Sequence, residues 1–140
     1  MAMKKLLLLT LTAASLTLLH ADDVDLNDLE GDWHLRIMDG YDVRKIRAIL
    51  DFQPKKMKLE GFDACNRISG KLVKKPDNIY TSKLISTRMA CRGKSFSFVS
   101  KHLHETIEEG FTIKEEKRSG IKGITIKSRS HELFFKRMGE

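Results

Sequence analysis

The most reactive side chains in this 140-residue sequence are two cysteines, Cys65 and Cys91. A cysteine acts as a nucleophile, as a metal ligand or as half of a disulfide. A nucleophilic thiol needs a histidine base within hydrogen-bonding distance and a third group that orients the base. After the N-terminal apolar stretch and His20, the sequence offers four histidines, none in a recognisable catalytic motif: His34, His102, His104 and His131. We therefore expect no catalytic residue and no enzymatic activity.

The spacing of the histidines also argues against a metal site. His102 and His104 are two positions apart, and such residues point in different directions on a helix, whereas ligands on one helix lie three or four positions apart. His104 and Glu108 have the four-residue spacing, but this pair is common on the exposed face of a helix. Because the sequence shows no third ligand that converges with either pair, we expect no metal and no cofactor.

The N-terminal residues are typical of a secretory signal peptide. Lys4 and Lys5 precede an apolar stretch from Leu6 to Leu19, and the small residue Ala21 marks a cleavage point. The stretch is shorter than the roughly 18 to 20 apolar residues that span a bilayer, and no lipoprotein cysteine follows it. We expect residues 1–21 to be removed, no transmembrane span to remain, and the chain to be periplasmic or secreted.

If the chain is exported, a disulfide is the favoured role for the two cysteines, ahead of a nucleophile or a metal ligand. In an oxidising compartment a lone pair of cysteines usually forms a disulfide. Cys65 and Cys91 are 26 positions apart, and closing a loop of that size stabilises a fold by about 3.5 kcal/mol in the chain-entropy model. The sequence therefore predicts a structural Cys65–Cys91 disulfide.

The charge of the chain is positive and unevenly distributed. The sequence has 26 Lys and Arg against 19 Asp and Glu. Residues 22–32 contain six acids and no base, so the chain from Trp33 onward has a net charge of +11. Positive charge keeps a protein soluble, and it also attracts phosphates and anionic lipid head groups. We expect no nucleic acid partner in an exported protein, and an envelope protein or an anionic lipid instead.

The hydrophobic pattern predicts strands on both sides of a single helix. Trp33, Leu35 and Ile37 occupy alternate positions, as in a half-buried strand. Similar alternation, or bounding turn residues, predicts further strands at 45–52, 57–61, 67–73, 79–85, 111–113, 124–126 and 133–135.

One segment has the period of a helix. Phe96, Val99, Leu103 and Ile107 are spaced three, four and four positions apart, which makes one apolar stripe of an amphipathic helix that ends near Gly110. Strands joined by short turns are antiparallel neighbours. The predicted fold class is α+β, with a strongly curved, mostly antiparallel sheet, a partial barrel, packed on one helix.

Two short motifs carry a resemblance to a known family. The segment CNRISG, from Cys65 to Gly70, precedes STRMACRG, from Ser86 to Gly93, and the predicted helix follows. Together with the upstream GDWHLRIMDG, these motifs resemble those of the META domain family, in particular the bacterial heat-shock protein HslJ group. The resemblance spans residues 33–140, which leaves residues 22–32 as an acidic lead-in.

The resemblance implies a small α+β domain of exported or envelope-associated proteins, and no catalytic residue. It also implies a link with the heat-shock response and with antibiotic tolerance. We therefore expect a non-enzymatic envelope protein that acts by binding, in stress or antibiotic tolerance. Two alternatives remain open: a carrier of lipid or a small hydrophobic ligand inside the half-barrel, and an interaction module for a partner protein or anionic lipopolysaccharide.

The residues of the two motifs have two interpretations. In the first, Asn66 and Thr87, with Arg67 and Arg88, form a hydrogen-bonded corner that fixes two strand ends, and Gly70 marks a bulge or a close backbone approach. The family-motif residues are Asn66, Gly70, Thr87 and Met89. In the second, the neighbouring arginines Arg67, Arg88 and Arg92 form a site for an anion or a partner.

Overall fold

The computed structural model describes residues 24–140 of the chain. The signal peptide predicted for residues 1–21 lies outside the described residues. Ten strands form one sheet, with the order β6-β5-β4-β3-β1-β10-β9-β8, and β2 and β7 pair beside this path with β1 and β5. All pairings are antiparallel. The strands are β1 (Gly31–Met38), β2 (Tyr41–Asp42), β3 (Ala48–Gln53), β4 (Lys58–Asp63), β5 (Arg67–Lys75), β6 (Ile79–Ser82), β7 (Ile85–Ser86), β8 (Thr112–Arg118), β9 (Ile121–Lys127) and β10 (Glu132–Arg137).

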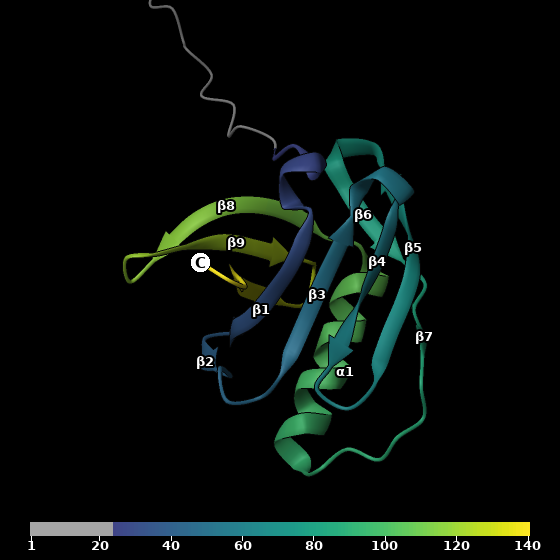
Figure 1. The fold of residues 1–140 in the computed structure, drawn as a ribbon, viewed down its shortest axis with the longest axis vertical. Helices are drawn as coiled ribbons and strands as arrows, with labels where there is room; N and C mark the ends of the chain where they lie inside the picture. Colours follow the sequence, from purple (N-terminus) through teal and green to yellow (C-terminus); the bar gives the residue numbers. More distant parts are fainter. Residues whose placement is uncertain (1–23) are drawn as a thin grey trace, which may run out of the picture.

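The sheet curls around one helix, α1 (Lys94–Glu109), as Figure 1 shows. The predicted α+β class with a partial barrel is therefore confirmed. Val99, Leu103 and Ile107, three members of the predicted stripe, have no exposed surface. The helix ends where predicted, because Gly110 has a φ of +100° that favours glycine.

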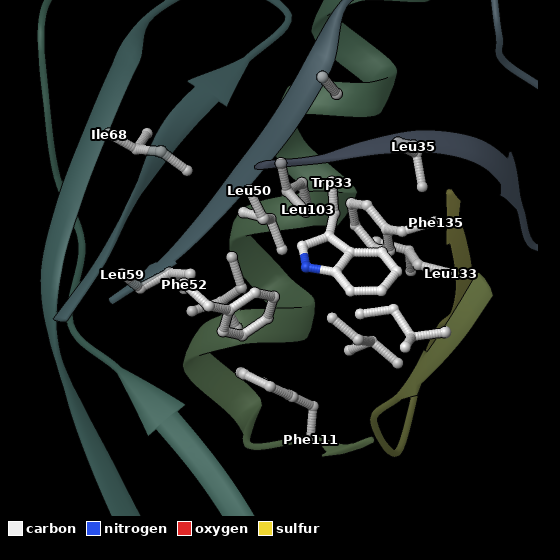
Figure 2. Close-up of a cluster of buried hydrophobic side chains, with 14 of the residues drawn as sticks. Trp33, Leu35, Leu50, Phe52, Leu59, Ile68, Leu103, Phe111, Leu133 and Phe135 are labelled. Atoms are coloured by element: carbon white, nitrogen blue, oxygen red, sulfur yellow. The ribbon is translucent and has the colours of Figure 1, made fainter. Parts of the chain in front are cut away.

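The core lies between the concave face of the sheet and α1. Figure 2 shows Leu103 of the helix among strand residues that include Trp33, Leu50 and Phe135. Trp33 is buried with its ring packed in the core, and its indole N–H donates to the carbonyl of Leu29 at 3.0 Å. This bond satisfies the one polar atom of the ring.

Residues 26–32 of the N-terminal acidic segment belong to the fold. A 3-10 helix, η1 (Leu26–Leu29), buries Leu29, and strand β1 already begins at Gly31. Arg137 of β10 donates to the carbonyl oxygens of Asp28 and Glu30 at 2.5 and 2.6 Å. Residues 31 and 32 of the acidic lead-in are thus part of β1, and Leu29 packs in the core next to its start.

The strand predicted at 79–85 is interrupted. Strand β6 pairs with the second half of β5, and β7 pairs with Ile68 and Ser69 near the start of β5. Between these two pairings the chain passes close to Gly70, where an added Cβ would lie 2.2 Å from Ser82 Oγ and 2.9 Å from the carbonyl oxygen of Lys83. Only glycine permits this approach.

Candidate functional site

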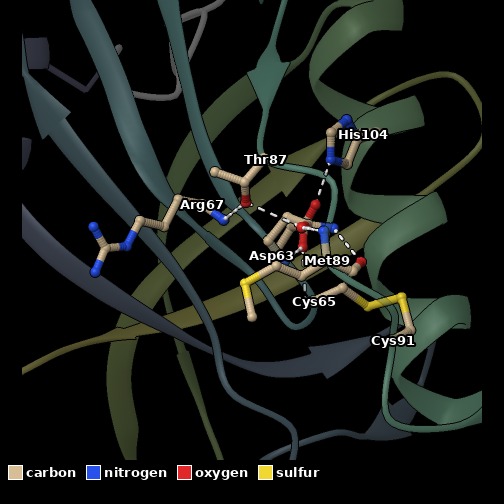
Figure 3. The surroundings of a disulfide bond; sticks show 8 residues. Asp63, Cys65, Arg67, Thr87, Met89, Cys91 and His104 are labelled. Carbon is tan, nitrogen blue, oxygen red and sulfur yellow. Dashed lines mark hydrogen bonds and ion pairs between the residues drawn. A yellow bond between two sulfur atoms is a disulfide. The ribbon is translucent and has the colours of Figure 1, made fainter.

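The two family motifs meet in a hydrogen-bonded corner at one end of β5 (Figure 3). Asn66 Oδ1 accepts from Thr87 Oγ1 at 3.0 Å and from the backbone N–H of Met89 at 2.5 Å, and Asn66 Nδ2 donates to the carbonyl of Met89 at 3.2 Å. Thr87 Oγ1 also accepts from the backbone N–H of Arg67 at 3.1 Å, and its own N–H donates to the carbonyl of Arg67. These bonds attach the loop after β7 to the start of β5.

Asp63 holds the other side of the corner. Its Oδ1 accepts from the backbone N–H groups of Cys65 and Asn66 at 2.8 and 2.6 Å, in a turn where Ala64 has a φ of +85°. Its Oδ2 lies 2.6 Å from Nε2 of His104 on α1. One carboxylate, only 1% exposed, therefore connects the turn before β5 to the helix.

The pKa values of this pair shift in opposite directions. Burial by itself would raise the pKa of Asp63, but the hydrogen bonds from His104 and the backbone outweigh it and hold that pKa below its ordinary value. The hydrogen bond to Asp63 raises the pKa of His104, against the opposing effect of burial. The pair is stabilised as carboxylate and imidazolium.

Cys65 and Cys91 form a disulfide, with Cα atoms 4.8 Å apart. It joins the turn between β4 and β5 to the loop that precedes α1 (Figure 3). Both cysteines of the described residues are thereby used, and no thiol remains for nucleophilic or metal chemistry. A disulfide of this kind fits an oxidising compartment.

The three arginines proposed as an anion site are all exposed, but they do not converge on one pocket. Arg67 lines a groove on the outer face of the sheet with Arg47, Phe62 and the acids Asp51 and Glu60. Its guanidinium points away from the corner in Figure 3. Arg88 and Arg92 lie in the loop between β7 and α1. The corner is thus built by other motif residues, and the arginines project from it.

The arginines are part of a larger charged surface that sequence reasoning did not single out. Residues 64–94 contain eight basic residues and one acid, Asp77. All eight are exposed, and within residues 24–140 none of them forms an ion pair. We call this surface the basic edge: Arg67, Lys71, Lys74, Lys75, Lys83, Arg88, Arg92 and Lys94. The sequence signal was the run of unbalanced bases.

Large apolar side chains are exposed beside these charges. Val73, Ile85 and Met89 are 46%, 77% and 68% exposed. Arg67, Lys71 and Val73 are separated by even numbers of positions on β5, so they point to the same face. Ser69 is two positions from both Arg67 and Lys71, so its side chain points to the same face. Ile85 lies directly opposite Ser69 and therefore shares that face. The basic edge is an amphipathic surface.

The interior of the half-barrel is occupied by the protein's own side chains. The helix stripe that a carrier would offer to its ligand is buried against the sheet, as Figure 2 shows for Leu103. A hydrophobic ligand would have to displace α1 to reach this surface. The interior of the described half-barrel is therefore filled, and the apolar groove near the helix lies outside it, lined by Val43, Ile46, Phe98 and Val99 among others.

A second polar cluster lies away from the corner, on the other side of α1 from His104. Ligand-type atoms of Asp39, His102 and His131 all lie within 4.8 Å of one another. Glu105 Oε2 lies 2.8 Å from His131 Nε2. Burial by itself would lower the pKa of His131, but its hydrogen bonds to Glu105 and Asp39 raise it. Sequence spacing did not reveal this group, because its members come from a turn, the helix and the residue before β10.

Comparison with known proteins identifies relatives of this chain. The family model of the META domain matches residues 24–139. A protein solved by NMR is similar over 81% of this chain and 95% of its own, with 24% identity and a TM-score of 0.64. A second, the NMR structure of a protein from Burkholderia xenovorans, covers 86% of this chain and 93% of its own, with 18% identity and a TM-score of 0.60. No curated protein matches the chain. At these identities the two structures show the shared fold.

The described residues contain no helix that is both long enough and apolar enough to cross a membrane.

Proposed function

The chain belongs to the META domain family, and we propose that it is an exported, non-enzymatic protein of the HslJ type that binds phosphate-bearing lipid head groups of the cell envelope through its basic edge. The observation that carries this proposal is a run of eight exposed bases in residues 64–94, none of them ion-paired within the described residues, with three exposed apolar side chains among them.

The charge of the basic edge supports an anionic ligand. A lysine or arginine near an anionic membrane surface contributes about 1 kcal/mol to binding. Surface bases that already form ion pairs contribute less, because binding must first break those pairs. The eight residues of the basic edge have no such partners within the described chain, so their full charge is available.

The exposed apolar residues favour a lipid surface over a purely polar anion. Lysines on an edge strand also prevent edge-to-edge pairing, but that role does not call for an exposed Ile85 or Met89. Peripheral membrane proteins combine basic residues with apolar side chains that enter the head-group region. Ile85 stands beside β5 in the sheet, and Met89 lies in the loop between Arg88 and Arg92, with its backbone N–H bonded to Asn66.

The proposal is tested by co-sedimentation with vesicles. We expect the purified protein to bind phosphatidylglycerol vesicles and not phosphatidylcholine vesicles, with binding that weakens as salt rises. The triple variant Arg67→Ala, Arg88→Ala, Arg92→Ala should bind roughly 100-fold more weakly, from about 1 kcal/mol per base. The matched control removes three exposed lysines from the far end of the sheet: Lys114→Ala, Lys117→Ala and Lys122→Ala.

The outcomes separate the alternatives. Equal losses in the triple variant and the control would mean that net charge acts without a defined surface, and would overturn the proposal. A second arm with lipopolysaccharide identifies the source of the phosphate. Binding to neither lipid, with an envelope protein captured by the wild type but not by the triple variant, would instead favour the interaction-module alternative.

The biological role in the proposal is tolerance of envelope stress or antibiotics. Its support is membership of the family, together with a surface suited to the membrane. A strain that lacks the gene should lose viability under heat or antibiotic stress, and the wild-type gene should restore it. If the triple variant restores viability as well as the wild type, the basic edge has no part in that role.

A further inference from the structure

We propose that Asp39, His102 and His131 form a binding site for a divalent transition-metal ion of the zinc type, with Glu105 as a positioning residue. The site is independent of the basic edge. Its three ligands come from the turn between β1 and β2, from α1 and from the residue before β10. Their donor atoms already lie within 4.8 Å of one another.

The donor set matches this class of metal. Two imidazole nitrogens and one carboxylate oxygen are typical ligands of Zn²⁺ and of neighbouring ions such as Cu²⁺. Around a tetrahedral zinc with bonds of about 2.0–2.2 Å, donor atoms are separated by about 3.3 Å. Side-chain movements of about 1 Å would therefore bring the three donors to bonding distance, with the fourth position open to water.

The surroundings hold the ligands in place. Asp39 Oδ1 accepts the backbone N–H of Glu132 at 2.8 Å, which leaves Oδ2 directed at His131 Nδ1, 2.7 Å away. The backbone N–H of His131 donates to Ser128 Oγ at 3.2 Å. The carboxylate and one imidazole are therefore fixed before any ion arrives.

Glu105 orients the ring of His131. With Glu105 Oε2 accepting from His131 Nε2 at 2.8 Å, the other nitrogen, Nδ1, faces Asp39 Oδ2 and can coordinate an ion that displaces the proton between them. Carboxylate–histidine–metal arrangements of this kind fix the tautomer of a ligating histidine. Glu105 thus has a role that its place on the helix surface did not suggest.

His102 supplies an independent indication of a missing partner. Its Nδ1 is buried and has no hydrogen-bond partner among the described residues, and its ring lies 4.5 Å from that of His131 between centroids. A buried polar atom without a partner costs about 1–3 kcal/mol. A metal ion bound at this nitrogen would supply the missing partner.

The test is a zinc titration of the untagged, chelator-treated protein by calorimetry. We expect one zinc ion per chain, with a dissociation constant in the micromolar range or tighter. His102→Gln and His131→Gln should each weaken binding about 100-fold, and Glu105→Gln about tenfold. The matched control is His34→Gln, a histidine of β1 outside the cluster. Unfolding midpoints measured without metal establish that each variant is folded.

A second measurement needs no variant. Cu²⁺ added in small amounts should broaden the NMR amide signals around Asp39, His102 and His131 before any others, and excess Zn²⁺ should restore them. Absence of zinc binding, equal weakening by His34→Gln and His131→Gln, or broadening centred elsewhere would overturn the proposal. In that event the cluster is an ion-pair network around His131.

Discussion

At the scale of single residues, the corner at the start of β5 depends on Asn66 and Asp63 more than on the arginines beside them. Asn66 makes three side-chain hydrogen bonds to Thr87 and Met89. Asp63 connects two backbone N–H groups to His104. Of the two interpretations of the motifs, this geometry supports the structural one for Asn66 and Thr87, and leaves the arginine guanidinium groups available for binding.

Replacing Asn66 should destabilise the fold. Asn66→Ala removes all three bonds, and the loop after β7 loses its attachment to β5, so we expect the free energy of unfolding to fall by about 2 kcal/mol. The adjacent exposed residue provides the comparison: Arg67→Ala should change that energy by about 0.5 kcal/mol or less. Urea denaturation of the three proteins measures both effects, and equal effects would contradict the account.

Asp63 makes stability depend on acid pH. Its pKa is lower in the folded protein than in the unfolded chain, so its contribution is present at neutral pH and is lost as pH falls through the folded-state value. Asp63→Asn should therefore lower the free energy of unfolding by about 2 kcal/mol at pH 7, as expected for hydrogen bonds to a charged group.

The same variant provides the pH test. The difference in the free energy of unfolding between the wild type and Asp63→Asn should narrow steadily below pH 4. Protonation of Asp63 in the wild type then removes the negative charge that the variant lacks at every pH. Urea denaturation at pH 7, 5 and 3 measures this difference, and a constant difference across that range would show that the charge of Asp63 contributes nothing.

At the scale of elements, the helix is held to the sheet by its apolar stripe and by links at both ends. The disulfide fixes the loop that enters α1, and Thr81 Oγ1 of β6 donates to the carbonyl of Ile107 at 3.1 Å near the helix C-terminus. Glu105 and Glu109 near that end contact His131 and Ser130. These contacts explain two acids whose charge opposes the helix dipole.

Breaking the disulfide should cost a large part of the stability. The double variant Cys65→Ala, Cys91→Ala should lower the free energy of unfolding by about 3 kcal/mol, because the unfolded chain regains the freedom of a 26-residue loop. Reductant should have a similar effect on the wild type and none on the variant. An unfolding midpoint of the wild type that reductant leaves unchanged would argue against a structural role.

The elements were more predictable than the clusters of side chains. The helix stripe, the disulfide pair and most strands follow from periodicity and composition, because the core selects apolar residues at every second or every third to fourth position. The interruption at β6 and β7 depends on the passage of the chain over Gly70, and the contacts of His131 join segments 26 and 92 positions apart. Such pairings leave no periodic trace in one sequence.

At the scale of the whole molecule, the charge is divided between surfaces. Asp28, Glu30 and Asp32 lie at or next to the start of β1, where Arg137 of β10 donates to the carbonyl oxygens of Asp28 and Glu30. The bases of residues 64–94 lie on β5, between β6 and β7, in the loop before α1 and at the first residue of α1. A molecule with this asymmetry has a preferred orientation in the field of an anionic surface.

If the basic edge contacts anionic lipid, NMR chemical-shift mapping with bicelles will locate the contact residue by residue. With phosphatidylglycerol in the bicelles, we expect the largest shifts at Arg67, Ile85 and Met89, and small shifts along β8 and β9. Bicelles of phosphatidylcholine alone should leave all these signals in place. Shifts of equal size with both lipids, or shifts concentrated on β8 and β9, would contradict the account.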